Sequence, residues 1–144
     1  IEAPEGLTAL GYEGRDNPRA VRDDHLSVFL GAGENSYAFT VNARGSLLDA
    51  RNGDREWNSG VRAATSAHAE GWQVEIAIPL AELEWAGPPP EIRRWKINII
   101  RRDQTAHRDS ELSPTFGRSA LDHLVPMYQS DPAAVARFAD LVLR

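Results

Sequence analysis

Hydrophobic and polar residues alternate most regularly in the stretch Gly71–Leu83, which reads GWQVEIAIPLAEL. Pro79 has no backbone N–H, so it ends the extended segment, and the four residues after it can form one helical turn. The pattern therefore predicts a strand over 71–78 followed by a short turn. One face of that strand carries the apolar side chains Trp72, Val74, Ile76 and Ile78, which we expect in the core.

Weaker alternation predicts further strands on both sides of this stretch, and Leu7–Tyr12 is a marginal candidate. The last apolar segment, Phe138–Leu143, fits either the end of a helix that starts near Asp131 or a final strand, and local propensity leaves both open. Short, evenly spaced strands are typical of an all-β fold, here an antiparallel β-sandwich with one or two short helical turns. The other predicted strands are Asp24–Leu30, Ser36–Asn42, a segment beginning at Leu47, Val61–His68 and Trp95–Asp103.

The same alternation predicts which aromatic side chains are buried. Tyr37 and Phe39 share one face of their strand with Val41, and Trp95 shares one face with two isoleucines. We expect these residues, together with Trp72, to form the core.

Composition narrows the class of protein. The chain has 144 residues, of which 42% are hydrophobic and 26% charged, as in one globular domain. Its formal net charge of −5 argues against binding to a nucleic-acid backbone. The sequence contains no cysteine, which excludes disulfides and thiolate metal sites. It also lacks the run of about 18 apolar residues that a membrane-spanning helix needs.

Several motifs occur in an order that resembles the family 9 carbohydrate-binding modules. They are Asp23-Asp24 before a strand, then YAFTVNARG, GWQVEIAIPLAEL, WKINIIRRD, LSPTF and DPAAVARFADLVL. The resemblance extends from about Leu7 to Leu143. It implies a jelly-roll-like antiparallel β-sandwich in which 138–143 is a strand. It also implies a secreted bacterial protein, extracellular or periplasmic, that holds the end of a sugar chain between two tryptophans.

The residues that would hold the sugar differ from the family pattern. Val21 stands where the resemblance implies the first tryptophan, and only Tyr128 is near the place of the second. Ser27, Thr40 and Ile100 stand where a glutamate, an arginine and a glutamine are implied. The resemblance thus implies the fold with its usual sugar clamp missing.

Three residues remain candidates for ligand binding. Trp57 lies in a polar loop, RNGDREWNSG, where an aromatic side chain can stack on the apolar face of a sugar ring. Tyr128 is a second exposed aromatic candidate. Arg102 either binds ligand or, like Arg101, pairs with a carboxylate across the sheet.

The polar loop also contains a cluster of hard oxygen ligands. Asp49, Asn52 and Asp54, with Glu56 nearby, would suit a structural calcium ion. Their spacing is not that of an EF-hand, and the alternative interpretation is a solvated turn.

No catalytic motif is visible. The four histidines have no metal-binding spacing, and no nucleophile elbow, phosphate-binding loop or dinucleotide fingerprint occurs. We therefore expect a non-catalytic, carbohydrate-binding-like module whose partner is an oligo- or polysaccharide. The alternative is a structural or interaction domain that docks on another domain or on a neighbouring chain.

The beginning of the chain raises one further expectation. Members of the resembled family carry additional strands before the segment that Leu7–Tyr12 matches. We expect residues 1–144 to form one domain that is a fragment of a longer polypeptide, with an incomplete sandwich and an exposed sheet edge.

Overall fold

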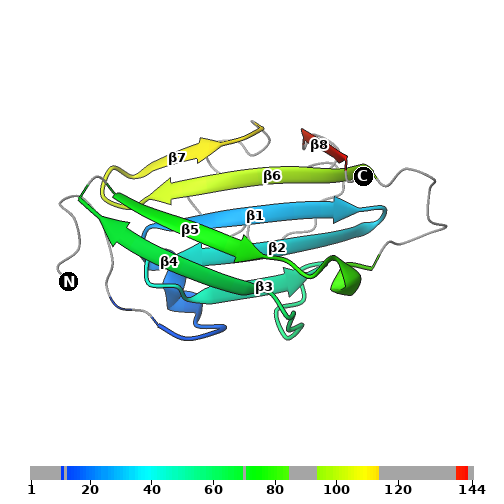
Figure 1. Ribbon diagram of the computed structural model, residues 1–144, viewed down its shortest axis with the longest axis horizontal. Helices are drawn as coiled ribbons and strands as arrows, with labels where there is room; N and C mark the ends of the chain where they lie inside the picture. Colours follow the sequence, from blue (N-terminus) through cyan, green and yellow to red (C-terminus); the bar gives the residue numbers. More distant parts are fainter. Residues whose placement is uncertain (1–10, 12, 70, 85–93, 114–138, 143–144) are drawn as a thin grey trace.

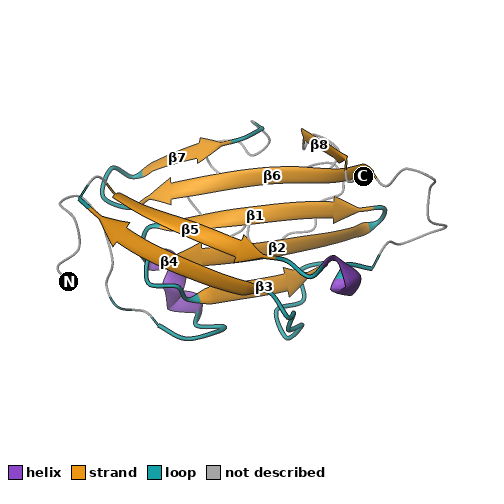
Figure 2. Cartoon of the chain, viewed as in Figure 1, coloured by secondary structure: helices purple, strands orange, loops and turns teal. Residues whose placement is uncertain are grey.

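The computed structural model is an antiparallel β-sandwich with two sheets of unequal size (Figures 1 and 2). The structure describes residues 11, 13–69, 71–84, 94–113 and 139–142. The smaller sheet pairs β4 (Arg62–His68) with β5 (Gly71–Ala77), and two 3₁₀ turns are η1 (Pro18–Arg22) and η2 (Leu80–Glu82). The larger sheet has six strands, β1 (His25–Ala32), β2 (Asn35–Asn42), β3 (Leu47–Arg51), β6 (Arg94–Asp103), β7 (Arg108–Glu111) and β8 (Ala139–Val142).

The larger sheet has the order β3-β2-β1-β6-β7, and β8 also pairs with β6. Strand β1 occupies one edge of β6, so β7 and β8 share the other. β7 pairs with the end of β6, from Ile100 to Asp103, whereas β8 pairs with its beginning, from Arg94 to Ile97. On this side, the long strand β6 is thus paired with two short strands, β7 and β8, one at each end.

The buried side chain of Asn98 lies where neither short strand reaches. Its Nδ2 donates to the carbonyl of Ser113 at 3.0 Å, and its Oδ1 accepts the Ser113 N–H at 2.9 Å. An asparagine side chain therefore supplies the donor and the acceptor that a neighbouring backbone would supply.

The core lies between the two sheets and follows the predicted alternation. Tyr37, Phe39 and Val41 face inward from β2, and Trp95 faces inward from β6 with 1% of its surface exposed. Phe29 is also buried, although it lies on the opposite face of β1 from Val28. Burial on both faces explains why the sequence of β1 is nearly continuous in apolar residues.

The expected burial of β5 was too high. Trp72, Val74 and Ile76 face the larger sheet, but all three are only half-buried. Among the described strands, the smaller sheet has two strands opposite six, so β5 has a neighbouring strand on one side only. Pro79 ends the extended segment as predicted, and the turn after it is η2.

The structure settles one open alternative and adds two elements that the sequence did not reveal. Ala139–Val142 is a strand, as the family resemblance implied. η1 and β7 lie outside the segments for which the sequence predicted a strand or turn. In η1, Asn17 caps the first turn by accepting the Arg19 N–H at 3.1 Å, and Pro18 occupies the first position, where its missing N–H costs nothing. Within the described residues, no helix has the length and apolar character needed to cross a membrane.

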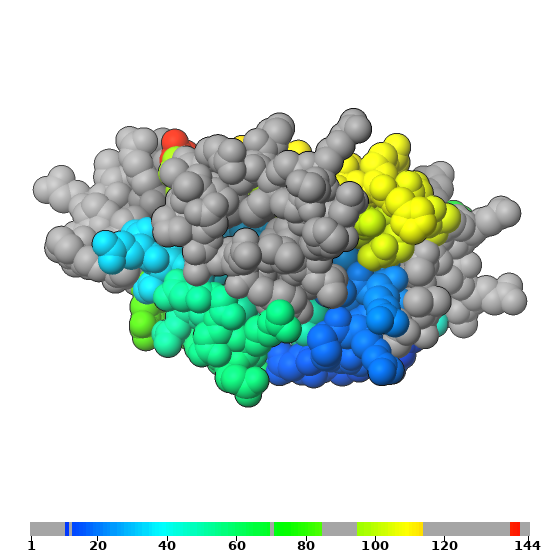
Figure 3. All heavy atoms as spheres, turned by 180° about the vertical axis from the view of Figure 1, so that it is seen from behind, coloured from blue at the N-terminus to red at the C-terminus, as the bar shows by residue number. Residues whose placement is uncertain are grey.

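The acidic pair before β1 connects three parts of the fold. Asp23 Oδ2 accepts the side-chain N–H of Asn42 at 3.0 Å, and Asp24 Oδ1 accepts the backbone N–H of Gln104 at 2.8 Å. Gln104 also donates from its side chain to the carbonyl of Val21 at 2.6 Å. Seen from behind, the blue η1 segment accordingly lies beside the yellow β6–β7 turn (Figure 3). This motif of the resembled family is structural in the present chain.

Candidate functional site

The loop between β3 and β4 places Trp57 at one end of the sandwich. Its ring centroid lies 5.4 Å from that of Tyr37 and 6.2 Å from that of Phe39, both in tilted arrangements. The guanidinium carbon of Arg51 lies 5.8 Å from the indole centroid, within cation–π range. Trp57 is thus anchored on the core yet remains partly exposed.

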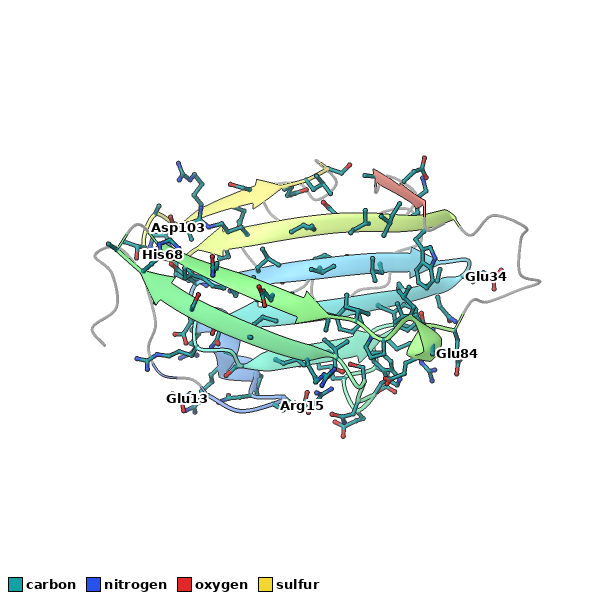
Figure 4. All side chains as sticks on the ribbon, viewed as in Figure 1. Glu13, Arg15, Glu34, His68, Glu84 and Asp103 are labelled. Atoms are coloured by element: carbon teal, nitrogen blue, oxygen red, sulfur yellow. The ribbon has the colours of Figure 1, made fainter. Side chains whose placement is uncertain are left out.

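Polar groups from three separate segments meet beside this indole. The backbone carbonyl of Glu84 accepts the side-chain N–H of Asn35 and the hydroxyl of Tyr37, each at 3.0 Å. The Glu84 carboxylate pairs with Arg51 Nη1 at 3.2 Å. Figure 4 shows Glu84 beside η2, at the end of the sandwich where Glu34 marks the β1–β2 turn. Burial raises the pKa of Tyr37, which keeps its hydroxyl a donor at neutral pH.

Asn52 fixes the geometry of these segments. Its backbone is in the left-handed region, with φ of 52°, which asparagine adopts more readily than most residues. Its Oδ1 accepts the Ser36 N–H at 2.8 Å, and its Nδ2 donates to Asn35 Oδ1 at 2.9 Å. We name Asn35, Arg51, Asn52, Trp57 and Glu84 the Trp57 cluster.

The predicted calcium ligands have other partners. Asp49 is buried, and its Oδ2 accepts from Arg15 Nη2 at 2.6 Å and from the N–H and hydroxyl of Ser59 at 2.7 and 2.6 Å. Asp54 Oδ1 accepts the backbone N–H of Glu56 at 2.9 Å. In the described part of the chain, no three acidic or histidine side chains are grouped so that they could hold a metal ion. Calcium at this loop stays a prediction.

Asp49 instead affects a neighbouring carboxyl group. Burial and the negative charge of Asp49 raise the pKa of Asp16, while Arg15 acts in the opposite direction. When protonated, Asp16 can hydrogen-bond to Asp49. The Arg15–Asp49 ion pair connects the segment before η1 to β3, and Arg15 also donates to the Ser59 carbonyl in the β3–β4 loop.

Arg102 lies in a nearly buried ion pair. Its Nη1 is 2.6 Å from Asp109 Oδ2, and the two side chains are only 14% and 9% exposed. The pair crosses from β6 to β7, which is the structural alternative considered for this arginine. His25 lies nearby, and burial lowers the pKa of its ring below the usual 6.5.

Three of the positions that the family resemblance assigns to sugar binding, those of Ser27, Thr40 and Ile100, meet on one face of the larger sheet. The register places Ser27 directly between Thr40 and Ile100. The Ser27 and Thr40 hydroxyls are 2.7 Å apart, and both side chains are 2% exposed. The two hydroxyls are therefore bonded to each other and are not accessible from solvent.

The sequence pointed to Trp57 but not to most of its neighbours. Asn35, Arg51 and Glu84 have no motif spacing and are separated by up to 49 residues, so only the fold reveals their proximity. Tyr128 lies outside the described residues. The structure therefore brings one of the three candidate ligand-binding residues into a polar cluster, and places Arg102 in a separate ion pair.

Comparisons with known proteins give the fold a precedent. No family model matches the chain, and no curated protein matches it. One solved structure, described as that of a "putative carbohydrate-binding protein" from Bacteroides uniformis, is similar with a TM-score of 0.64 and 18% sequence identity. The match covers 97% of this chain and 69% of that protein. At this identity the likeness shows a shared fold.

Proposed function

We propose that the chain is a non-catalytic, carbohydrate-binding module of a secreted bacterial protein, and that its saccharide contact is the Trp57 cluster. The observation that carries the proposal is a partly exposed indole with the Arg51 guanidinium over its ring. Arg51 pairs in turn with the Glu84 carboxylate, and the Glu84 carbonyl accepts the Asn35 amide. An aromatic face suits the C–H face of a sugar ring, and directed polar groups suit its hydroxyls. The similarity to a described carbohydrate-binding protein supports the class.

The geometry also sets an expectation for affinity. Arg51 lies over the indole and is paired with Glu84, so a sugar must share the ring with the guanidinium or displace it. The Ser27 and Thr40 hydroxyls, already bonded to each other in a buried position, offer no second contact. We therefore expect weak binding, with little or none to glucose and cello-oligosaccharides.

A glycan array followed by calorimetric titration of the best glycan tests this proposal. Trp57→Ala should abolish binding, whereas Trp57→Phe should retain part of it because a smaller ring still packs on Tyr37. Arg62→Ala, on the exposed face of β4, is the matched control and should bind like the parent chain. Failure of every glycan to bind, or equal binding by Trp57→Ala, would contradict the proposal.

A second candidate function is a structural or interaction domain that docks on another polypeptide. The specific observation in its favour is the half-buried apolar row Trp72, Val74 and Ile76 in a sheet of only two strands. This surface shares no residue with the Trp57 cluster, so the two functions can be tested with different variants.

A further inference from the structure

The free side of β5 has the features of an incomplete sheet. Among the described strands, β5 pairs only with β4. His68 pairs with Gly71, and only two residues lie between them in the sequence. In a hairpin with a two-residue loop, the residues that flank the loop form a hydrogen-bonded pair, so His68 and Gly71 are such a pair. Hydrogen-bonded pairs then recur at every second residue. The N–H groups of Trp72, Val74 and Ile76 consequently point away from β4.

An apolar strip of the larger sheet accompanies this edge. Ile97 and Ile99 face the same side as the buried Trp95, yet both are only half-buried. Leu141 of β8 is likewise half-buried on that side. In Figure 1, β6, β7 and β8 extend past β5 on the side away from β4, so this strip continues beyond the small sheet.

A charged residue marks one end of the strip. Arg101 follows Ile97 and Ile99 at the same spacing of two, so it lies on the same face of β6. Its side chain is exposed, and it has no hydrogen bond or ion pair to any described residue. A partner that covers the isoleucines would therefore meet a positive charge at this end.

We propose that this surface binds one extended peptide strand, which adds to β5 and lies over β6. The strand carries apolar side chains at alternate positions, opposite Ile97 and Ile99, and a carboxylate opposite Arg101. Added strands of this kind bind through main-chain hydrogen bonds and gain specificity from alternate side chains. In the antiparallel orientation, the C-terminal end of the added strand lies nearest Arg101, because β5 begins beside the end of β6 (Figure 1).

The overhang of the larger sheet excludes a second copy of the chain as the occupant. Two β5 strands paired about a two-fold axis would place both larger sheets on the same side of the joined small sheets. The second copy's sheet would then collide with β6, β7 and β8, which already occupy that space. A single strand fits where a whole domain does not.

The test uses residue-resolved amide exchange of the intact chain with a synthetic peptide. The probe is a seven-residue peptide that is blocked at both ends. Threonine occupies its odd positions, valine positions two and four, and glutamate position six. Exchange of the N–H groups of Trp72, Val74 and Ile76 should slow by about tenfold or more on saturation, because they gain hydrogen bonds. The N–H groups of Gln73 and Glu75, which face β4, should change little.

A charge exchange makes the test specific. Arg101→Glu should weaken the glutamate peptide and bind a lysine version of the same peptide, whereas Arg108→Glu, on exposed β7, should leave the preference unchanged. Equal protection of all five β5 amides before the peptide is added would overturn the proposal, as would unchanged exchange at the three edge amides. If the apparent molecular mass of the chain doubles as its concentration rises, and the three edge amides become protected at the same time, the surface binds a second copy and the proposal is overturned. None of these outcomes bears on saccharide binding at Trp57.

Discussion

The carboxylate Oε2 of Glu82 accepts the backbone N–H of Gly60 at 2.5 Å, joining the turn after β5 to the loop that holds Trp57. A Cβ atom at Gly60 would overlap the Glu82 carboxylate, which is the mobile end of a flexible side chain. Gly60→Ala should therefore displace Glu82 and lower the free energy of unfolding by about 0.5–1.5 kcal/mol, the net value of one hydrogen bond. Urea denaturation measures this loss.

A double-mutant cycle provides the control for this contact. If Gly60→Ala acts by displacing Glu82, its effect should be largely lost in a Glu82→Ala background. Fully additive losses would mean that the cost arises in the loop backbone instead.

The second prediction compares two apolar residues of the opposed sheets. Phe39 is fully buried on β2, which is paired on both sides, so Phe39→Ala should cost about 3–5 kcal/mol. Ile76 on β5 is only half-buried, so Ile76→Ala should cost clearly less than Phe39→Ala. Denaturation midpoints of the two variants, at unchanged slope, check the order. Equal losses would show that β5 is as well packed as β2.

The third prediction concerns pH. Burial lowers the pKa of His25, with Arg102 acting in the same direction and Asp109 and Asp24 in the other. Below pH 6.5 this histidine is protonated in the unfolded chain but stays neutral in the folded chain, where its pKa is lower. Stability should therefore fall as the pH drops through 6.5 toward the lower pKa of the folded state. The raised pKa of Asp16 acts oppositely, but nearer its usual value of 3.8.

His25→Asn isolates this effect. The asparagine amide can still donate to the carbonyl of Asp23, which His25 contacts through Nδ1 at 2.9 Å, but it does not titrate. The variant should lose stability less steeply between pH 6.5 and 5, whereas His68→Asn at an exposed position should keep the parent slope. Identical slopes for the parent and His25→Asn would refute the assignment.

The fourth prediction separates a structural from a ligand-binding Arg102. Removing one partner of a nearly buried ion pair leaves an uncompensated charge, so Arg102→Met should cost about 3 kcal/mol. Arg102→Met with Asp109→Leu should recover much of that loss, since no buried charge remains. A ligand-binding arginine would instead give a stable variant with weakened glycan binding.

Much of the fold could be predicted because alternation is a local signal. The strands that contain Phe39, Trp95 and Val74 carry an apolar side chain at every second residue, and Pro79 marks a boundary through its missing N–H. β7 could not be predicted, since RDSE is polar on both faces and is held in the sheet by pairing with β6 and by the Arg102–Asp109 contact.

The candidate site was predictable only at its aromatic residue. Trp57 was conspicuous as an indole in a polar loop, but Glu84 contributes a backbone carbonyl, which no side-chain pattern reveals. The depth of burial on β5 was also beyond local reasoning. It depends on how many strands lie beside β5, and alternation reports the face of a residue but not its neighbours.

The divided edge of β6 has a consequence for synthesis of the chain. Strands β1, β2 and β3 can pair as soon as they emerge, but the beginning of β6 must wait for β8, about forty residues later. Before β8 is synthesised, the backbone N–H and C=O groups of Arg94–Ile97 on that edge have no β8 partner, although the apolar isoleucines of β6 are already present. An unpaired apolar strand edge favours wrong pairing between nascent chains. A nascent chain that ends before residue 139 should therefore aggregate more readily than one that ends after residue 142. The four residues of β8 thus protect the exposed edge of β6 against association with other chains.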